Sequence, residues 1–343
     1  MRTWNRMLGC LLALFLCPGI SLAWEPDVLR WQARLKKLTQ TVGTRQSFTP
    51  EESLAFQYLW EELRAMGYSD QELFCQLMAV PPAVTRKTGI QNMSNLVAVK
   101  RALKENPTVI ILSAHYDTVS TSLGVKDNGS GVAALLTMAD CFRKLPPFPD
   151  TELRFVFFTA EEKGELGSGY YTMTLTVEER ERILGMFNID LITLEEGAED
   201  MAFSCDTLGG RTPEGYREGR EELPVENTVS RAILRALWEE EDFTPELLGA
   251  RFFIPRHFGD SDHLRFHQIG VDAANLSFRG SPAAGGLWPA DMHTFEDGVK
   301  PFDLGLTQLA LNVIFRAVSE LARDPDYGAS SPLDQPWKMV YSK

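Results

Sequence analysis

Short apolar segments alternate with helical patterns along this chain, and that alternation restricts its fold more than any other feature. Four apolar segments rich in β-branched or aromatic residues are bounded by turn formers, at residues 95–99, 108–114, 153–159 and 187–192. Several are apolar at consecutive positions, which is typical of strands buried on both faces. Helical patterns separate or follow them, at 131–142, 177–184 and 302–321. The alternation predicts an α/β fold with a mainly parallel sheet covered by helices on both sides.

The first 23 residues have the three-part pattern of a secretory signal peptide. Arg2 and Arg6 precede an apolar run over 7–17, and Ser21 and Ala23 are small residues three and one before a cleavage site. The run is too short to span a bilayer, so we expect no transmembrane segment after signal removal. The chain is therefore expected to be exported, either secreted or periplasmic.

Residues 24–343 are expected to form one domain. The stretch 24–75 is predicted to be helical, since apolar residues recur at helical spacing and Thr49 followed by Pro50 is typical of a helix start. Residues 194–226 are rich in glycine, proline and charge. We interpret them as a surface excursion of the domain and not as a linker between two domains.

Composition excludes some classes of function. The chain has 47 acidic residues against 34 Lys and Arg, and a formal net charge of −13. This balance argues against binding to nucleic acid or to an anionic membrane, because neutralising phosphates requires clustered Lys and Arg. Cys75, Cys141 and Cys205 remain after signal removal, so at most one disulfide can form, and no pair has zinc-finger spacing.

Histidines and carboxylates follow the predicted strands. His115 and Asp117 come directly after the segment 108–114, and Glu161 and Glu162 follow the segment 153–159. Open α/β sheets bind their ligands at the carboxyl ends of strands. Asp117 can accept the second ring N–H of His115, as in many metal-bound imidazoles. Of the two glutamates, one can bind a metal while the other acts as general base.

Three further side chains are candidate ligands. Asp127 begins a predicted helix, Asp190 is expected inside an apolar strand, and His293 lies in a loop. Asp297 is a candidate partner of His293. Each feature has an ordinary alternative, such as helix capping for Asp127 or a solvated helix face for the glutamate pair. Together, two histidines and several carboxylates at the ends of separate elements indicate a dinuclear metal site, with zinc the expected metal.

Other residues carry weaker signals. His263 and His267 are four apart on a predicted helix, but the zinc-protease motif needs a glutamate at position 264, where this chain has leucine. We expect structural or rim roles for both, and a loop position for His257. The chain has neither a Gly-x-Ser-x-Gly elbow nor a phosphate-binding loop motif. Three aromatic residues are candidates for lining an apolar pocket, although core positions are more usual: Phe252, Phe253 and Trp288.

The order of the main motifs resembles that of the co-catalytic zinc aminopeptidases, a family that includes secreted bacterial leucyl aminopeptidases and has the glutaminyl cyclases as relatives. The matching segments run from about Asn92 to Asp297 and include Ser261-Asp262-His263, whereas the chain before residue 90 has no diagnostic motif. The resemblance implies a single α/β domain with a mixed, mostly parallel central sheet sandwiched by helices. It also implies a di-zinc peptidase that releases N-terminal residues from peptide substrates.

Transferred by position, the resemblance assigns five metal ligands. Asp127 would bridge two zinc ions. His115 and Asp190 would complete one site, and Glu162 and His293 would complete the other.

The resemblance also implies that Glu161 is the general base and that Asp117 orients the first histidine ligand. Two residues depart from the family pattern. Lys126 stands where the family often has an acidic residue or alanine, and Glu165 stands where it often has leucine. Neither is a ligand, so both are expected to affect the rim of the substrate pocket.

Two alternative functions stay open, and so does the direction of cleavage, because carboxypeptidases share this metal cage. A glutaminyl-peptide cyclotransferase would use one zinc ion to cyclise an N-terminal glutamine, but the segment 127–131 is more similar to the peptidases. A non-catalytic binding domain that retains the fold is the second alternative. Such a domain would be expected to have lost ligands, and none is missing from this sequence.

Overall fold

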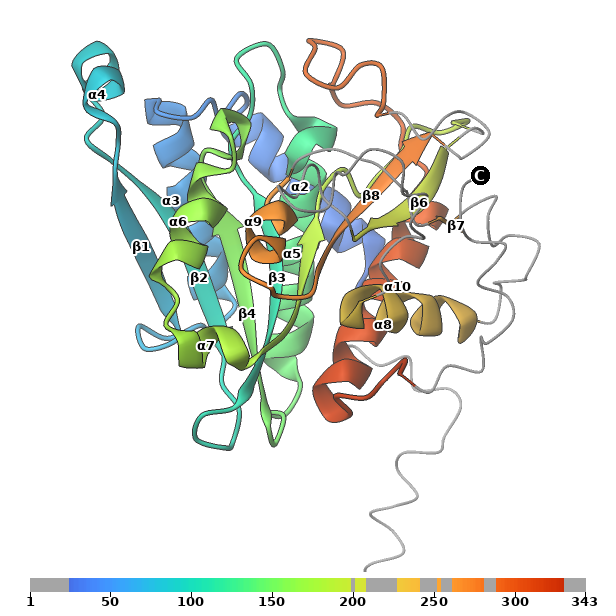
Figure 1. The fold of residues 1–343 in the computed structure, drawn as a ribbon. Coiled ribbons are helices and arrows are strands. Elements are labelled where there is room, and N and C mark those ends of the chain that lie inside the picture. Colours follow the sequence, from blue (N-terminus) through green and yellow to red (C-terminus); the bar gives the residue numbers. More distant parts are fainter. Residues whose placement is uncertain are drawn as a thin grey trace, which may run out of the picture.

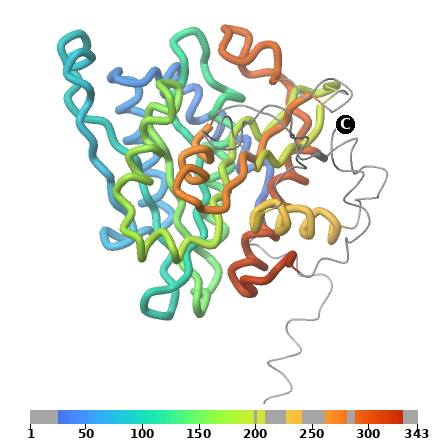
Figure 2. Tube along the Cα trace, in the orientation of Figure 1, coloured from blue at the N-terminus to red at the C-terminus, as the bar shows by residue number. Residues whose placement is uncertain are grey.

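One eight-stranded sheet forms the centre of the computed structural model, which describes residues 25–198, 201–207, 227–240, 252–253, 261–280 and 288–329. The strands lie in the order β1-β2-β4-β3-β5-β8-β6-β7. In Figure 2 the segment of the edge strand β1 is blue-green at the left, and that of β6 is yellow-green. The bounds are β1 Leu73–Ala79, β2 Asn92–Lys100, β3 Thr108–His115, β4 Thr151–Phe158, β5 Ile183–Ile189, β6 Met201–Asp206, β7 Phe252–Phe253 and β8 Ala273–Gly280.

Four central strands run in the same direction. β3 pairs in parallel with β4 and β5, and β5 pairs in parallel with β8. β2 is antiparallel to β4, β1 is antiparallel to β2, and β6 is antiparallel to β8. The predicted mixed, mostly parallel sheet is confirmed. Its central strands therefore present their carboxyl ends at one edge, where open α/β sheets bind ligands.

Helices cover both faces of the sheet (Figure 1). On one face lie α2, α3, α5, α8 and α10, and on the other lie α6, α7 and α9. The bounds are α2 Val28–Thr41, α3 Pro50–Ala65, α4 Pro82–Thr88, α5 Gly131–Lys144, α6 Leu166–Thr174, α7 Val177–Glu181, α8 Thr228–Trp238, α9 His263–His267 and α10 Leu304–Arg323, with the short helices η2 Val125–Ser130 and η3 Glu161–Lys163.

Strand β3 explains the run of consecutive apolar residues in the sequence. Ile110 and Leu112 pack in the hydrophobic cluster that contains α5, whereas Val109 and Ile111 pack on the opposite face with Tyr171 of α6. All four β3 residues are fully buried. A strand with helices on both sides has no solvated face and so needs no polar alternation.

Several predicted boundaries were wrong. The stretch 24–75 contains α2 and α3, but its end belongs to β1, which begins at Leu73. Helix α7 ends at Glu181, and the predicted helix 177–184 gives way to β5 because Ile183 pairs with Val109 of β3. Strand β5 ends at Ile189, so Asp190 follows the strand and does not lie inside it.

The predicted surface excursion 194–226 also needs correction. It contains β6, which is buried and antiparallel to β8, so this part of the stretch is a strand of the sheet. Pairing with β8 supplies the packing that the local sequence does not indicate. Residues 208–226 lie outside the described residues, as do the predicted signal peptide 1–23 and His257.

Cys75, Cys141 and Cys205 are all free thiols in the structure. Cys75 is exposed on the edge strand β1, and the other two are buried. Within the described ranges, no helix combines the length and apolar character needed to cross a membrane.

Candidate metal centre

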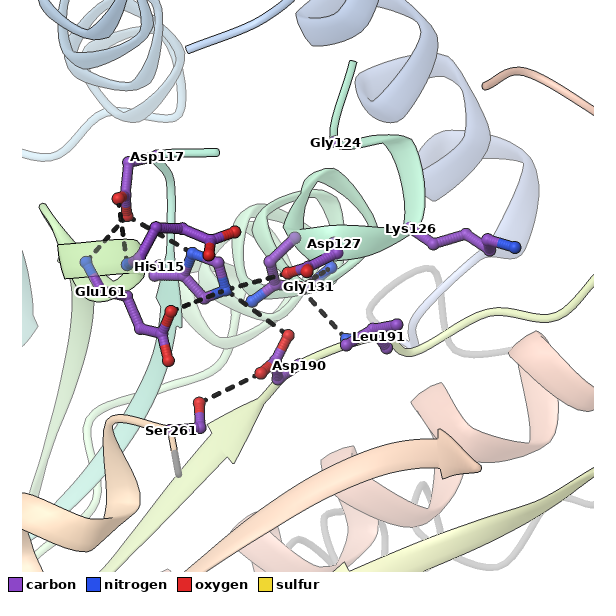
Figure 3. A network of polar contacts seen from close by, with 12 residues as sticks. His115, Asp117, Gly124, Lys126, Asp127, Gly131, Glu161, Asp190, Leu191 and Ser261 are labelled. Atoms are coloured by element: carbon purple, nitrogen blue, oxygen red, sulfur yellow. Dashed lines mark hydrogen bonds and ion pairs between the residues drawn. The ribbon is translucent and has the colours of Figure 1, made fainter. Parts of the chain in front are cut away.

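The predicted site residues gather at the carboxyl edge of the central strands, and several of them are labelled in Figure 3. His115 is the last residue of β3, Asp190 directly follows β5, and Glu161 and Glu162 form the short turn after β4. Parallel pairing brings these strand ends together although the residues are far apart in sequence. Asp127 and His293 approach the same point from η2 and from the loop before α10.

His115 faces carboxylates on both ring nitrogens. Its Nε2 lies 3.2 Å from Asp127 Oδ1, 3.5 Å from Asp190 Oδ1 and 4.0 Å from Glu161 Oε2. Its Nδ1 lies 3.4 Å from Asp117 Oδ1. Burial lowers the pKa of His115, but the surrounding carboxylates outweigh it and raise the pKa well above 6.5.

Asp127 lies between the two histidines. Its Oδ1 faces His115, and its Oδ2 lies 2.9 Å from Nε2 of His293. The same His293 nitrogen is 3.3 Å from Glu162 Oε2. Burial raises the pKa of Asp127, but the two histidines dominate and hold it below its ordinary value. The hydrogen bond with Asp127 raises the pKa of His293 to about 9.

Two groups of three side chains can each surround a cation. His115, Asp127 and Asp190 form one, and Asp127, Glu162 and His293 form the other, with ligand atoms in each group within 4.8 Å of one another. Imidazole nitrogen and carboxylate oxygen are donors that zinc accepts.

Buried atoms without partners support this fit. Glu162 Oε1 and Asp190 Oδ1 have no hydrogen-bond partner among the described residues. Burial, followed by the charge of Asp127, raises the pKa of Glu162 to about 8. Uncompensated carboxylates in a buried site are costly, and bound cations would compensate them.

Asp117, predicted to orient His115, also contacts the turn that carries the two glutamates. Its Oδ1 accepts a hydrogen bond from the main-chain N–H of Glu161 at 3.0 Å, and its Oδ2 accepts one from Glu162 N–H at 3.2 Å. Oδ2 also accepts a 2.5 Å hydrogen bond from Ser47 Oγ. Asp117 thus joins the loop after β3 to the turn after β4. Ser47 lies before residue 90, in the part of the chain that has no diagnostic motif.

Asp190 is held by a series of side-chain hydrogen bonds that continues to strand β3. Its Oδ2 accepts a hydrogen bond from Ser261 Oγ at 3.0 Å, and Ser261 Oγ in turn accepts one from Asn188 Nδ2 at 2.8 Å. Ser113 of β3 donates to Asn188 Oδ1. The free oxygen Oδ1 of Asp190 is thereby directed toward His115. The Ser261-Asp262-His263 motif was the sequence signal for this contact.

Glu161 lines a cavity of about 320 Å³ at the centre of the site. Its side chain is 12 % exposed. Burial raises the pKa of Glu161 well above 4.5, and the nearby carboxylates of Asp262, Asp190 and Glu162 raise it further, while His115 acts in the opposite direction.

The loop that carries His293 is tied to the segment that carries Asp127. Asp297 accepts hydrogen bonds from the main-chain N–H groups of Lys126 at 2.8 Å and Asp127 at 3.2 Å. The prediction that Asp297 partners His293 was therefore wrong. The side chain of Lys126 is only 4 % exposed, and its Nζ contacts Asp291 Oδ2 at 2.5 Å and Glu195 Oε1 at 2.8 Å. Lys126 is thus a buried link, not an exposed rim residue.

The remaining candidates take different positions. Trp288 lines the cavity, with the Arg279 guanidinium 3.4 Å from its ring centroid. Glu165 also lines it and pairs with Arg265 at 2.9 Å. His263 and His267 are in α9 and belong to neither three-residue group. Phe252 and Phe253 form β7, and their side chains lie outside the described part of the structure.

Sequence comparisons match this chain to a peptidase family and to proteins named as aminopeptidases. The family model described as peptidase family M28 matches residues 95–318. Aminopeptidase YwaD of Bacillus subtilis (strain 168) is 30 % identical over 235 residues, which is 68 % of this chain and 46 % of that protein. An aminopeptidase of Pseudomonas aeruginosa (strain UCBPP-PA14) is 37 % identical over 118 residues, 34 % of this chain and 21 % of that one. The chain matches less than half the length of these relatives.

Solved structures share the fold. BSAP, a zinc aminopeptidase from Bacillus subtilis, has a TM-score of 0.71 at 18 % identity, covering 88 % of this chain and 95 % of that one. A glutaminyl cyclase from Porphyromonas gingivalis has a TM-score of 0.63 at 19 % identity, covering 86 % and 98 %. At such identities the likeness establishes the fold alone.

Proposed function

The chain belongs to peptidase family M28, and on this premise we propose that it is an exported two-zinc aminopeptidase that removes N-terminal residues from peptides. The observation that carries the proposal is the position of Asp127, whose two carboxylate oxygens face different histidines. A carboxylate in this position can serve two metal ions at once.

In this proposal each three-residue group holds one zinc ion. His115 and Asp190 complete the first site, Glu162 and His293 complete the second, and Asp127 is shared. When bound, zinc would activate a water molecule and polarise the carbonyl of the scissile peptide bond.

Glu161 is the proposed general base. Its carboxylate borders the cavity and is not a member of either three-residue group. It accepts the proton from the attacking water and then delivers it to the leaving amine. Asp117 holds the main chain of this glutamate in place and keeps the ring of His115 oriented. The alternative of a binding domain is disfavoured, since every proposed ligand and the base are present.

The cavity favours a substrate with a free amino group over one with a free carboxylate. Leu191, Trp288 and Met292 provide apolar lining, and Glu165 adds a carboxylate. No lysine or arginine is among the described residues that line the cavity. A carboxypeptidase needs a cation for the terminal carboxylate of its substrate, and guanidinium is the usual choice.

The test uses the purified chain with two equivalents of zinc and three peptides of otherwise equal sequence. The first begins with leucine, the second is its N-acetylated form, and the third begins with glutamine. We expect release of free leucine from the first peptide and no reaction with the second. Ring closure of the third without chain shortening would instead support the cyclotransferase alternative. Zinc binding without reaction on any peptide would support a binding domain.

Export is proposed separately, from the signal pattern of residues 1–23. Expression of the full chain in a bacterial host, followed by N-terminal sequencing of the product outside the cytoplasm, tests it. A product that retains Met1 and stays with the cytoplasmic fraction would contradict it.

A further inference from the structure

Residues 116–124 form the loop between two proposed ligands. β3 ends at His115, and η2, which carries Asp127, begins at Val125. The conformation of this loop therefore determines how the first histidine and the shared aspartate face each other. Asp117 also lies in it and holds the turn of Glu161 and Glu162.

One fully buried side chain, Arg45, closes this loop. Its Nε donates a hydrogen bond to the carbonyl oxygen of Tyr116 at 2.8 Å. Its Nη1 donates to Leu123 O at 2.9 Å, and its Nη2 donates to Gly124 O at 2.8 Å. The guanidinium thus joins the first residue of the loop to its last two.

The main chain of Arg45 adds to the connection. Its N–H donates to Thr118 Oγ1 at 2.9 Å, and its carbonyl accepts the Thr118 N–H at 3.2 Å. Arg45 lies between α2 and α3, before the region 95–318 that the family model matches.

The buried charge of Arg45 has only main-chain hydrogen-bond acceptors within the described ranges. Among the described residues, no carboxylate oxygen lies within salt-bridge distance of its guanidinium, and main-chain carbonyls take its hydrogen bonds. Burial lowers its pKa to about 10, while Asp117, Asp297 and Asp127 act to raise it. The group therefore stays charged at neutral pH and offsets part of the negative charge of the site.

Gly124 shows how closely the loop packs on the guanidinium. Its φ is 58°, in the left-handed region, and a Cβ there would lie 2.1 Å from Thr118 Cγ2 and 2.8 Å from Arg45 Nη2. The loop can close around Arg45 only with glycine at this position.

We propose that Arg45 is a positioning residue of the metal centre, which holds the loop 116–124 so that His115 and Asp127 are set for zinc before zinc binds. The proposal rests on the proposed zinc function. Lysine cannot replace it, because an ammonium on a flexible stem lacks the planar fork that reaches both ends of the loop.

The test compares Arg45→Lys and Arg45→Met with the wild type and with Arg154→Lys as a matched control. Arg154 is also largely buried, with its guanidinium bound to Glu152 and Tyr171, but it does not line the cavity. The zinc dissociation constant is measured by competition with a chelator, the absorption spectrum of the cobalt-substituted protein reports ligand geometry, and thermal unfolding of the metal-free protein reports the fold.

We expect both Arg45 variants to bind zinc about 10- to 100-fold more weakly, the magnitude typical for residues that orient metal ligands. Their cobalt spectra should change, and Arg154→Lys should match the wild type in both measurements. Unchanged zinc affinity and cobalt spectrum in a folded Arg45→Lys variant would overturn the proposal. Failure of both Arg45 variants to fold without metal would overturn it too, because Arg45 would then serve the fold as a whole. A wild-type chain that binds no zinc would instead refute the proposed function itself.

Discussion

Asp117 Oδ1 accepts a hydrogen bond from the main-chain N–H of Glu161 at 3.0 Å. This contact joins the loops that follow two neighbouring parallel strands, β3 and β4. Because the second oxygen accepts the N–H of Glu162, one buried carboxylate sets the positions of the proposed base and of a proposed ligand. The proposed metal centre therefore depends on a residue that need not touch the metal.

Replacing Asp117 by asparagine should weaken zinc binding. Asparagine keeps one acceptor oxygen, but its NH₂ group replaces the oxygen that accepts from Glu162 N–H and Ser47 Oγ. The substitution also removes the negative charge beside His115. We expect a zinc dissociation constant about 10- to 100-fold higher, measured by chelator competition. Asp150→Asn is the control, since the Asp150 side chain is 66 % exposed and the residue directly precedes β4, which begins at Thr151. Equal zinc affinities for the two variants would contradict the role given to Asp117.

The two adjacent glutamates should respond differently to the same change. Glu161→Gln should still bind two zinc ions but lose about 10²- to 10⁴-fold in kcat, because only the proton acceptor is removed. Glu162→Gln should bind close to one zinc ion per chain. Metal content by atomic absorption, together with the rate of leucine release, distinguishes them. A Glu161→Gln enzyme with wild-type kcat would show that another group is the base.

Lys126 should affect zinc binding at the His293 side. Lys126→Met removes a buried cation between Asp291 and Glu195, so the loop that carries His293 loses a contact to the Asp127 segment. We expect weaker binding of the second zinc ion, seen in a zinc titration by calorimetry, with the first ion unaffected. Lys300 contacts the same two acids but is 36 % exposed. Lys300→Met should therefore change the dissociation constant of the second zinc ion by about twofold or less. A larger effect of Lys300→Met than of Lys126→Met would contradict the prediction.

Trp288 should set the preference for an apolar first residue. Its ring lines the cavity and is held over the Arg279 guanidinium. Trp288→Ala should lower kcat/KM for peptides that begin with leucine by about 10-fold or more, as expected when a large apolar contact is lost. Phe295, 80 % exposed and not among the cavity residues, is the control. The prediction requires Phe295→Ala to leave kcat/KM near the wild-type value.

Glu52 should make the stability of the metal-free protein depend on pH. Burial, followed by the charge of Asp117, raises the pKa of Glu52 from 4.5 to about 7. The unfolded chain releases this proton above pH 4.5, but the folded chain keeps it to about pH 7. The free energy of unfolding therefore falls as the pH rises through this window, by at most roughly 3 kcal/mol from this group.

Urea unfolding followed by circular dichroism at pH 5, 6 and 7, with chelator present, tests the effect of Glu52. Glu52→Gln can keep contacts to Phe48 N–H and Thr159 Oγ1, and it should lose this part of the pH dependence. If the free energy of unfolding changes equally with pH in the variant and the wild type, other carboxylates cause the whole pH dependence.

Much of the fold could be predicted because its central strands have a strong local signal. Residues 108–114 and 153–159 are apolar at consecutive positions, and the structure contains β3 and β4 there. The predictions failed where pairing with a distant strand determines whether a segment is a strand or a helix. β6 lies in a stretch rich in glycine, proline and charge, and β5 begins at Ile183, inside the predicted helix 177–184.

The sequence by itself determined which chemical groups lie at two strand ends: His115 at the end of β3 with Asp117 beyond it, and the glutamate pair after β4. It placed Asp190 inside a strand, whereas this residue follows β5. Only the tertiary structure decided which oxygen faces which histidine, and that Arg45, Ser47 and Lys126 support the site. No local pattern predicts these supporting contacts, because they are made across gaps of about 70 residues. The physical reason is the parallel sheet, which brings strand ends together whatever the length of chain between them.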